Sequence, residues 1–267
     1  MKIVMTILLM VMHFVTNAQQ DNFVYSSVIK GNYRDVFVDN LGNVFLLNEN
    51  GQLKKTAPNG DSIAVFNNTR RYGKLHQVDV TNPLKILLFF KDFSTVVVLD
   101  RMLNQRSVID LRNHSLFQVS AVAQSYDNNI WVYDEQESKL RRINEEGQML
   151  DQTTDFRILF DTVPSPSVII DQDKQLYLYD STLGVYIFDY YGALKRKLAF
   201  LRWTDVAVIN QAIFGRKDNV LYKYEPGTLD LQEYQLPSSF AQAKKFVVGR
   251  GKIYLLTDSG VLIYEHK

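Results

Sequence analysis

The chain has 267 residues, no cysteine, and 30 basic against 29 acidic side chains, which gives a formal charge of +1. A nearly neutral chain lacks the basic surface that binds nucleic acid or an anionic membrane. The lack of cysteine excludes disulfides, zinc–thiolate sites, iron–sulfur clusters and cysteine nucleophiles. With 46% hydrophobic residues the chain is rich enough to form a large core, which must stabilise the fold without covalent cross-links.

Residues 1–18 have the layout of a secretory signal peptide. Lys2 gives a positive start, Ile3 to Val15 is mostly apolar, and small residues precede a cleavage site after Ala18. The alternative is a membrane anchor, but an apolar run of about 13 residues is shorter than the roughly 17–25 that cross a bilayer. We therefore expect an exported, soluble mature chain with no direct membrane insertion. Loss of Lys2 lowers its formal charge from +1 to 0.

Short aromatic and aliphatic runs recur after polar turns in the rest of the chain, as in "DNLGNVFLLN" and "YDNNIWVYD". Six such runs begin 36 to 46 residues apart, at 43–48, 85–91, 129–134, 175–180, 211–216 and 252–258. A period near 40 is typical of propeller blades and of helical solenoids. These runs alternate or are continuously apolar and are rich in Val, Ile, Tyr and Phe, which favours strands over helices.

Each run is the second strand of a predicted four-stranded unit. First strands are predicted at 35–40, 77–82, 118–124, 167–172, 205–211 and 245–250. Third strands are predicted at 51–57, 95–101, 139–145, 184–190, 219–225 and 260–266. Fourth strands are predicted at 61–67, 106–112, 148–154, 194–200 and 231–237.

The sixth unit lacks a fourth strand, and the run at 22–30 supplies one from the other end of the chain. Pairing of this first strand with the last unit would close a ring and remove exposed sheet edges. No low-complexity linker interrupts the repeats. The sequence therefore predicts a single all-β domain over residues 19–267, a six-bladed β-propeller closed by its N-terminal strand.

The segments "VDNLGNVFLLN", "GQLKKTAPNG" and "DEQESKLRRINEEGQ" resemble the NHL-type repeat of six-bladed propellers. In that pattern an Asp-x-x-Gly-Asn turn opens one strand and a later Pro-Asn-Gly turn ends the next. The resemblance covers the first, third and fourth units, and the others by hydropathy alone. It implies the fold. NHL-type propellers serve as binding platforms and occasionally as enzymes, so the resemblance implies no particular activity.

Propeller active sites usually lie at the mouth of the central channel, where the innermost strands begin. Asp35, Gln118 and Asp205 are predicted there, beside several cations. A calcium or magnesium site needs several converging oxygen ligands, which two carboxylates diluted by cations do not supply. A Ser–His–Asp group could be assembled from Ser167, His76 and Asp35, but nearly any ring of blades yields such a trio. We predict no catalytic residue, metal or cofactor.

Three segments combine apolar or aromatic residues with cations, a composition enriched at protein interfaces. The connection between the first two units carries Arg70, Arg71, Tyr72 and His76, which could ring the channel mouth and bind an acidic partner loop. The other two segments are the loop at 155–167, with Ile158, Leu159 and Phe160, and the hairpin and loop at 184–203, with Tyr191, Arg202 and Trp203. For the last segment a solvated outer strand is the alternative.

We expect a non-enzymatic propeller that works through protein–protein contacts in the cell envelope. It would be a scaffold or accessory subunit of a membrane or secretion complex, either in the periplasm or associated with the outer membrane; secretion into the medium remains open. The alternative is a binder of small ligands or glycans, or a hydrolase or lyase, that uses the channel mouth. A rigid ring suits the first role, because loops held by it lose little entropy on binding.

Overall fold

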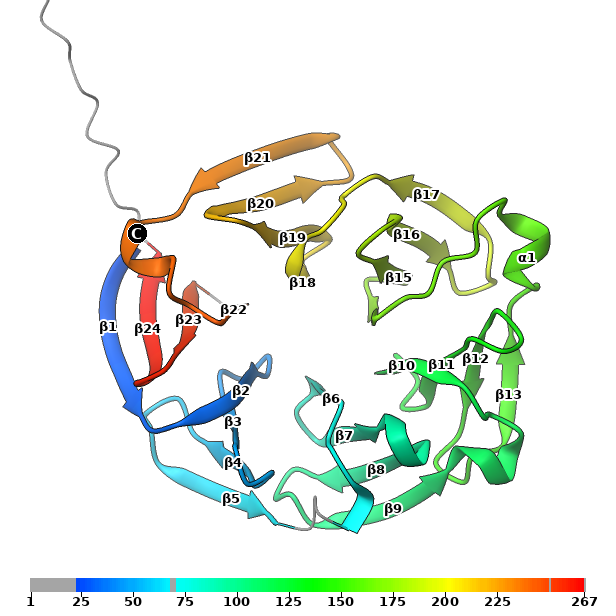
Figure 1. The fold of residues 1–267 in the computed structure, drawn as a ribbon, viewed down its shortest axis with the longest axis horizontal. Coiled ribbons are helices and arrows are strands. Elements are labelled where there is room, and N and C mark those ends of the chain that lie inside the picture. The colour runs from blue at the N-terminus through cyan, green and yellow to red at the C-terminus, as the bar shows by residue number, and fades with distance from the viewer. Residues whose placement is uncertain (1–22, 68–70, 250, 267) are drawn as a thin grey trace, which may run out of the picture.

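The computed structural model describes residues 23–67, 71–249 and 251–266 as a ring of six four-stranded antiparallel sheets (Figure 1). The predicted six-bladed propeller is therefore confirmed. In five of the sheets the first strand in chain order lies nearest the central channel, and in the sixth the strand nearest the channel is β22 (Lys245–Val248). No helix in these ranges is long and apolar enough to span a bilayer. The predicted signal peptide lies outside the described residues.

Five blades are built from four consecutive strands each. Blade 1 contains β2 (Tyr33–Val38), β3 (Val44–Asn48), β4 (Leu53–Thr56) and β5 (Ser62–Phe66). Blade 2 contains β6 (Gln77–Asn82), β7 (Lys85–Phe90), β8 (Thr95–Asp100) and β9 (Gln105–Asp110). Blade 3 contains β10 (Val119–Gln124), β11 (Ile130–Asp134), β12 (Lys139–Ile143) and β13 (Met149–Gln152). Blade 4 contains β14 (Val168–Gln172), β15 (Gln175–Asp180), β16 (Gly184–Asp189) and β17 (Leu194–Leu198). Blade 5 contains β18 (Thr204–Ile209), β19 (Ala212–Lys217), β20 (Val220–Glu225) and β21 (Asp230–Gln235).

Blade 6 joins the two ends of the chain. It contains β22 (Lys245–Val248), β23 (Lys252–Thr257) and β24 (Gly260–His266), and its outer strand is β1 (Phe23–Lys30). β1 runs antiparallel to β24, with Val24 opposite Glu265 and Lys30 opposite Gly260. The predicted closure by the N-terminal strand is confirmed, and it holds the ring through backbone hydrogen bonds between segments more than 200 residues apart.

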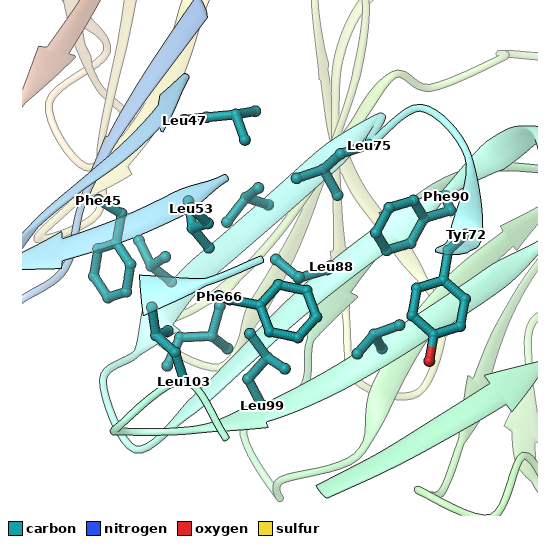
Figure 2. Close-up of a cluster of buried hydrophobic side chains, with 14 residues drawn as sticks. Phe45, Leu47, Leu53, Phe66, Tyr72, Leu75, Leu88, Phe90, Leu99 and Leu103 are labelled. Carbon is teal, nitrogen blue, oxygen red and sulfur yellow. The ribbon is translucent and has the colours of Figure 1, made fainter. Parts of the chain in front are cut away.

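Neighbouring blades pack face to face through apolar side chains. Figure 2 shows the cluster between blades 1 and 2, which includes Phe45 and Leu88. Consecutive residues of β7 alternate between two such clusters, so that Leu88 faces blade 1 while Leu87 and Phe89 face blade 3. A strand buried on both faces must be apolar at every position, and this explains the unbroken run "ILLFF".

The recurring polar turn is held by its first side chain. Asp39 accepts hydrogen bonds from the backbone N–H groups of Leu41 (3.0 Å) and Asn43 (2.8 Å), and its second oxygen accepts from the Asn43 side chain (2.7 Å). Gly42 has a φ of 84°, in the left-handed region that glycine adopts without strain. Asp100 and Asp189 hold their turns by the same bonds to N–H groups two and four residues on. The same side-chain bonding therefore fixes a tight turn after the first strand of blade 1 and after the third strands of blades 2 and 4.

Polar side chains at or beside the inner strands join neighbouring blades. The side-chain amide of Gln77 donates to the carbonyl of Val122 (2.7 Å) and accepts from its N–H (3.2 Å), linking blades 2 and 3. Further links of this kind include Arg34–Leu75 (3.0 Å), Ser120–Pro166 (2.8 Å) and Lys245–Asp35 (2.5 Å). These bonds satisfy polar groups around the channel and fix each blade against the next.

The two faces of the ring carry different segments, because successive strands of a blade run in opposite directions. The connections between blades and the loops between second and third strands share one face, which we call the connection face. The turns between first and second strands and between third and fourth strands share the other, the turn face. Among the fully described elements, the connection face carries the short helices η2 (Lys91–Phe93), η3 (Leu111–His114), α1 (Phe156–Leu159) and η4 (Ser238–Phe240).

Ring closure depends on the absence of a side chain at Gly260. Its φ is 140°, and a Cβ there would lie 2.2 Å from the carbonyl oxygen of Ile29 on β1. We expect Gly260→Ala to lower the free energy of unfolding by about 2 kcal/mol or more, since it combines backbone strain with a steric clash. Urea denaturation measures the change.

Gly227→Ala is the matched control, since a Cβ at Gly227 would have no neighbour within 4 Å. It should change stability by about 0.5 kcal/mol or less. Equal effects of the two substitutions would show that the β1–β24 contact does not limit stability.

Candidate functional site

The carboxylates predicted at the channel mouth are each paired with a cation. Asp35 lies 2.5 Å from Nζ of Lys245, and Asp205 lies 2.8 Å from Nε of Arg216. Asp205 also has a φ of 56° at an irregularity in the pairing of β18 with β19. These pairs bridge blades or strands, so both carboxylates have a structural role at the positions where a catalytic group was considered.

The remaining predicted channel residues do not form a reactive group with them. Gln118 and His76 are exposed. No hydrogen bond joins the side chains of Asp35, His76 and Ser167 within the described residues. In the same part of the chain no cluster of three or more His, Asp or Glu side chains is placed to hold a metal ion.

Three loops of the connection face meet above blade 2 and form one continuous surface. The loop at 71–76 contacts η2, since a Cβ at Gly73 would lie 2.7 Å from the ring of Phe93. The residue after η2, Ser94, donates its hydroxyl to the carbonyl of Phe117 (3.4 Å) in the loop that follows η3. Phe93 is 49% exposed and Phe117 is 55% exposed. We call this area, with Arg71, Lys74, His76 and Lys91, the blade-2 surface.

The blade-2 surface is basic. Arg71, Lys74 and Lys91 are exposed, and none of them forms an ion pair within the described residues. His76 is exposed at its edge but partly covered by its neighbours, and this partial desolvation lowers its pKa; the nearby charges of Lys91 and Lys74 lower it further against the opposing effect of Asp92. His76 also packs against Phe89, with ring centroids 5.9 Å apart. The surface therefore presents cations beside a neutral imidazole and two aromatic rings.

Tyr72 and Trp203 were predicted as contact residues, but both are buried. The Tyr72 ring packs on Phe90 at 5.3 Å, and its hydroxyl donates to the side chain of Gln105 (3.0 Å). Its place in the core between blades 1 and 2 is seen in Figure 2. Trp203 stacks on Phe200 at 4.2 Å. Both side chains belong to the core on which these loops pack. Arg70 lies outside the described residues.

Helix α1 divides its predicted contact residues between solvent and core. Asp155 begins the helix by accepting a hydrogen bond from the N–H of Arg157 (2.8 Å). Ile158 is 77% exposed and Leu159 is 44% exposed. Phe160 is half-buried against blade 4, with its ring 5.1 Å from that of Tyr186. Of the three predicted contact residues, Phe160 is therefore the least accessible, and it anchors the end of the helix.

The third predicted segment is split between the two faces. Tyr191 lies in the turn between β16 and β17 on the turn face, where it is 97% exposed. Arg202 is exposed on the connection face, at the entry to β18. The two side chains therefore do not belong to one surface, and Tyr191 is on the opposite side of the ring from Arg71.

Phe93 and Phe117 were not predicted as surface residues. Phe117 is exposed next to the buried Leu116, and no periodic pattern in the sequence distinguishes the two positions. Phe93 follows the apolar strand β7, and the sequence alone assigns it to the core as readily as to the surface. Only the meeting of the three loops shows that the two rings share a surface.

No protein family model and no curated protein matches the chain. Among solved structures, a streptogramin B lyase has a TM-score of 0.60 at 15% identity, over 87% of this chain and 78% of that one. Virginiamycin B lyase from Staphylococcus aureus gives 0.59 at 13% identity, over 87% and 79%. The β-propeller domain of Cps50 (Swd1) from Myceliophteria thermophila gives 0.61 at 9% identity, over 92% and 100%. These similarities, like the NHL-type resemblance, show a shared propeller fold and carry no activity.

We expect His76 to titrate below its ordinary pKa of 6.5. Because the pKa of His76 is lower in the folded chain than in the unfolded chain, protonation of the imidazole favours the unfolded state. The free energy of unfolding therefore decreases as the pH falls from 6.5 toward the pKa of the folded state. Lys91→Gln should raise the pKa of His76 toward 6.5 by removing a nearby positive charge. NMR titration of the imidazole measures both values.

Lys217→Gln provides the control, because Lys217 lies at the end of β19 in blade 5 and does not contribute to the shift of His76. A pKa that responds equally to the two substitutions, or to neither, would contradict the arrangement of charges on the blade-2 surface.

Proposed function

We propose that this propeller is a protein-interaction scaffold and that the blade-2 surface is its docking site. The observation that carries the proposal is the meeting of three loops, which places two half-exposed phenylalanines among three cations without ion-pair partners in the described residues. Aromatic anchors surrounded by charge are typical of protein interfaces. The loops are fixed to a closed ring, so little conformational entropy is lost when a partner binds.

The charge of the surface indicates the kind of partner. Arg71, Lys74 and Lys91 would attract a segment rich in Asp and Glu, and the rings of Phe93 and Phe117 would bury apolar side chains within it. We infer that the partner presents an acidic segment with interspersed apolar residues. The exposed Ile158 and Leu159 on α1 provide a second apolar contact on the same face of the ring.

We infer that the scaffold works outside the cytoplasm. Its support is the composition of residues 1–18, which follows the order of a secretory signal peptide. In this proposal the partner belongs to a complex of the cell envelope, and the protein is an accessory subunit of that complex. The connection face would then meet the partner while the turn face remains accessible.

Phe93→Ser combined with Phe117→Ser should abolish partner binding. Both rings are about half exposed, so their loss should lower the free energy of unfolding by only about 1 kcal/mol each while removing the apolar anchors of the surface. The measurement is purification of the tagged protein from gently solubilised envelopes, with quantitative mass spectrometry of what is retained. A stoichiometric protein should be retained by the wild type and lost with the double variant.

Leu84→Ser is the matched control. Leu84 belongs to the same blade and is 61% exposed, but it lies on the turn face between β6 and β7. The control should retain the partner. If the wild type retains no stoichiometric partner, or if all three proteins retain the same one, the blade-2 surface is not the docking site.

If the chain is exported, cleavage of the signal peptide fixes the first residue of the mature chain. N-terminal sequencing of protein isolated from a cell fractionation should begin at Gln19, after cleavage behind Ala18. Ala18→Arg should block processing, because the cleavage site requires small residues, and the longer precursor should accumulate. A mature chain that still begins at Met1 would contradict export by this route.

A further inference from the structure

The connection face carries a second surface around helix α1, between blades 3 and 4. The helix exposes two aliphatic side chains, Ile158 and Leu159. Asp161 is exposed just after the helix, and the backbone carbonyl of Glu137 accepts a hydrogen bond from Arg157 within it (3.4 Å). We call this area, with Glu135, Glu137, Ile158, Leu159 and Asp161, the α1 surface.

The α1 surface is acidic. The carboxylates of Glu135, Glu137 and Asp161 form no ion pair within the described residues, whereas Arg157 is already paired with Asp155 at 2.6 Å. Lys139, at the start of β12, offsets one of the three free negative charges. The surface therefore presents a net negative charge beside exposed aliphatic side chains.

The α1 surface adjoins the blade-2 surface, and the two are fixed relative to each other. Phe117 of the blade-2 surface is followed by Gln118, whose carbonyl accepts a hydrogen bond from the N–H of Glu135 (2.8 Å). The Glu135 carboxylate in turn accepts a hydrogen bond from the hydroxyl of Ser165 (2.5 Å), in the loop that follows α1. Because these bonds hold both surfaces to the ring, they cannot fold onto each other within one molecule.

The two surfaces are complementary in charge and in apolar content. The blade-2 surface combines the rings of Phe93 and Phe117 with cations that form no ion pair within the described residues. The α1 surface combines Ile158 and Leu159 with carboxylates that are equally unpaired in that part of the chain. Acidic groups interspersed with apolar residues are the chemistry that the blade-2 surface selects in a partner. This chain carries that chemistry itself.

A second copy of the chain can bring both pairs of surfaces together at once. The two surfaces lie side by side on one face, so a rotation of 180° about an axis in that face, between them, places each surface of one copy on the other surface of its partner. Such an interface is isologous and contains the same contact twice. The opposite arrangement, in which each surface meets its own counterpart, would oppose like charges and is disfavoured.

We propose that the connection faces of two copies associate as a two-fold symmetric dimer, with the blade-2 surface of each copy on the α1 surface of the other. This inference rests on the docking role given to the blade-2 surface in the proposed function. A second copy and a protein of the envelope then compete for the same surface. The dimer would be a resting form, from which an acidic partner releases the single ring.

The test measures the mass of the mature chain by sedimentation velocity up to about 1 mM, so that a dimer with a Kd in that range is detected. The wild type should form a dimer at low salt that dissociates as added salt screens the charges. Lys74→Glu combined with Lys91→Glu makes both surfaces acidic, and Glu137→Lys combined with Asp161→Lys makes both basic. Each double variant should be monomeric alone. An equimolar mixture of the two should form a dimer, because both contacts then join opposite charges.

Asp61→Lys combined with Glu146→Lys is the matched control. Both side chains are exposed in turns of the turn face, so this variant has the net charge of the Glu137→Lys/Asp161→Lys protein and an unchanged α1 surface. It should form a dimer as the wild type does. It should not restore a dimer of the Lys74→Glu/Lys91→Glu protein, because one of the two contacts would still join like charges.

A wild type that stays monomeric at low salt up to about 1 mM, or a mixture of the two double variants that stays monomeric, would overturn the dimer. Capture of a partner from envelopes is a separate measurement. The Glu137→Lys/Asp161→Lys variant should still capture that partner, since its blade-2 surface is unchanged. A wild type that forms the dimer but retains no envelope protein would contradict the proposed function and leave the dimer standing.

Discussion

Pairing of β1 with β24 is the contact on which the rest of the ring depends. Each blade buries both faces against its neighbours, and blades 1 and 6 can do so only if the ring is closed. The backbone bonds between β1 and β24 provide that closure without any cross-link, in a chain that has no cysteine. We expect strand pairing over such a long sequence separation to form late, because its loop-closure entropy must be offset by contacts that already exist.

Polar side chains of the inner strands hold neighbouring blades together, whereas the side chains that are free to bind a partner lie elsewhere. Polar side chains around the channel bond to the next blade, as in the contacts Gln77–Val122 and Asp35–Lys245. Groups committed to such contacts are not available to a ligand without loss of the contact. The exposed aromatic side chains of Phe93, Phe117 and Tyr191 form no hydrogen bonds between blades within the described residues, and they all lie in loops at the rim. Binding at the rim is thus compatible with a channel whose charges hold the blades together.

The sequence was sufficient to predict the blades, because strand periodicity and turn chemistry are local. The run "ILLFF" is apolar at every position since β7 lies between two blades, and the Asp39 turn recurs for reasons of local hydrogen bonding. Exposure within the loops is not local. Tyr72 and Arg71 are adjacent, yet one is buried against Phe90 and the other is exposed, and only the packing of blade 1 on blade 2 decides between them. The stacking of Tyr126 on Tyr190 at the boundary between blades 3 and 4 could not be predicted for the same reason, since the two residues are 64 positions apart in the sequence.

The links between inner strands are distributed unevenly, and this affects how the molecule would respond to mechanical load. Bonds of the Gln77–Val122 kind join blades 6, 1, 2, 3 and 4 in succession. Blade 5 instead contacts its neighbours through side chains farther out, such as Tyr179 bonded to the carbonyl of Trp203 and Arg216 over the ring of Phe246. We therefore expect blade 5 to be the most compliant segment of the described ring. A load applied to the connection face at blade 2 would then pass through the bonded blades, and distortion would concentrate at blade 5.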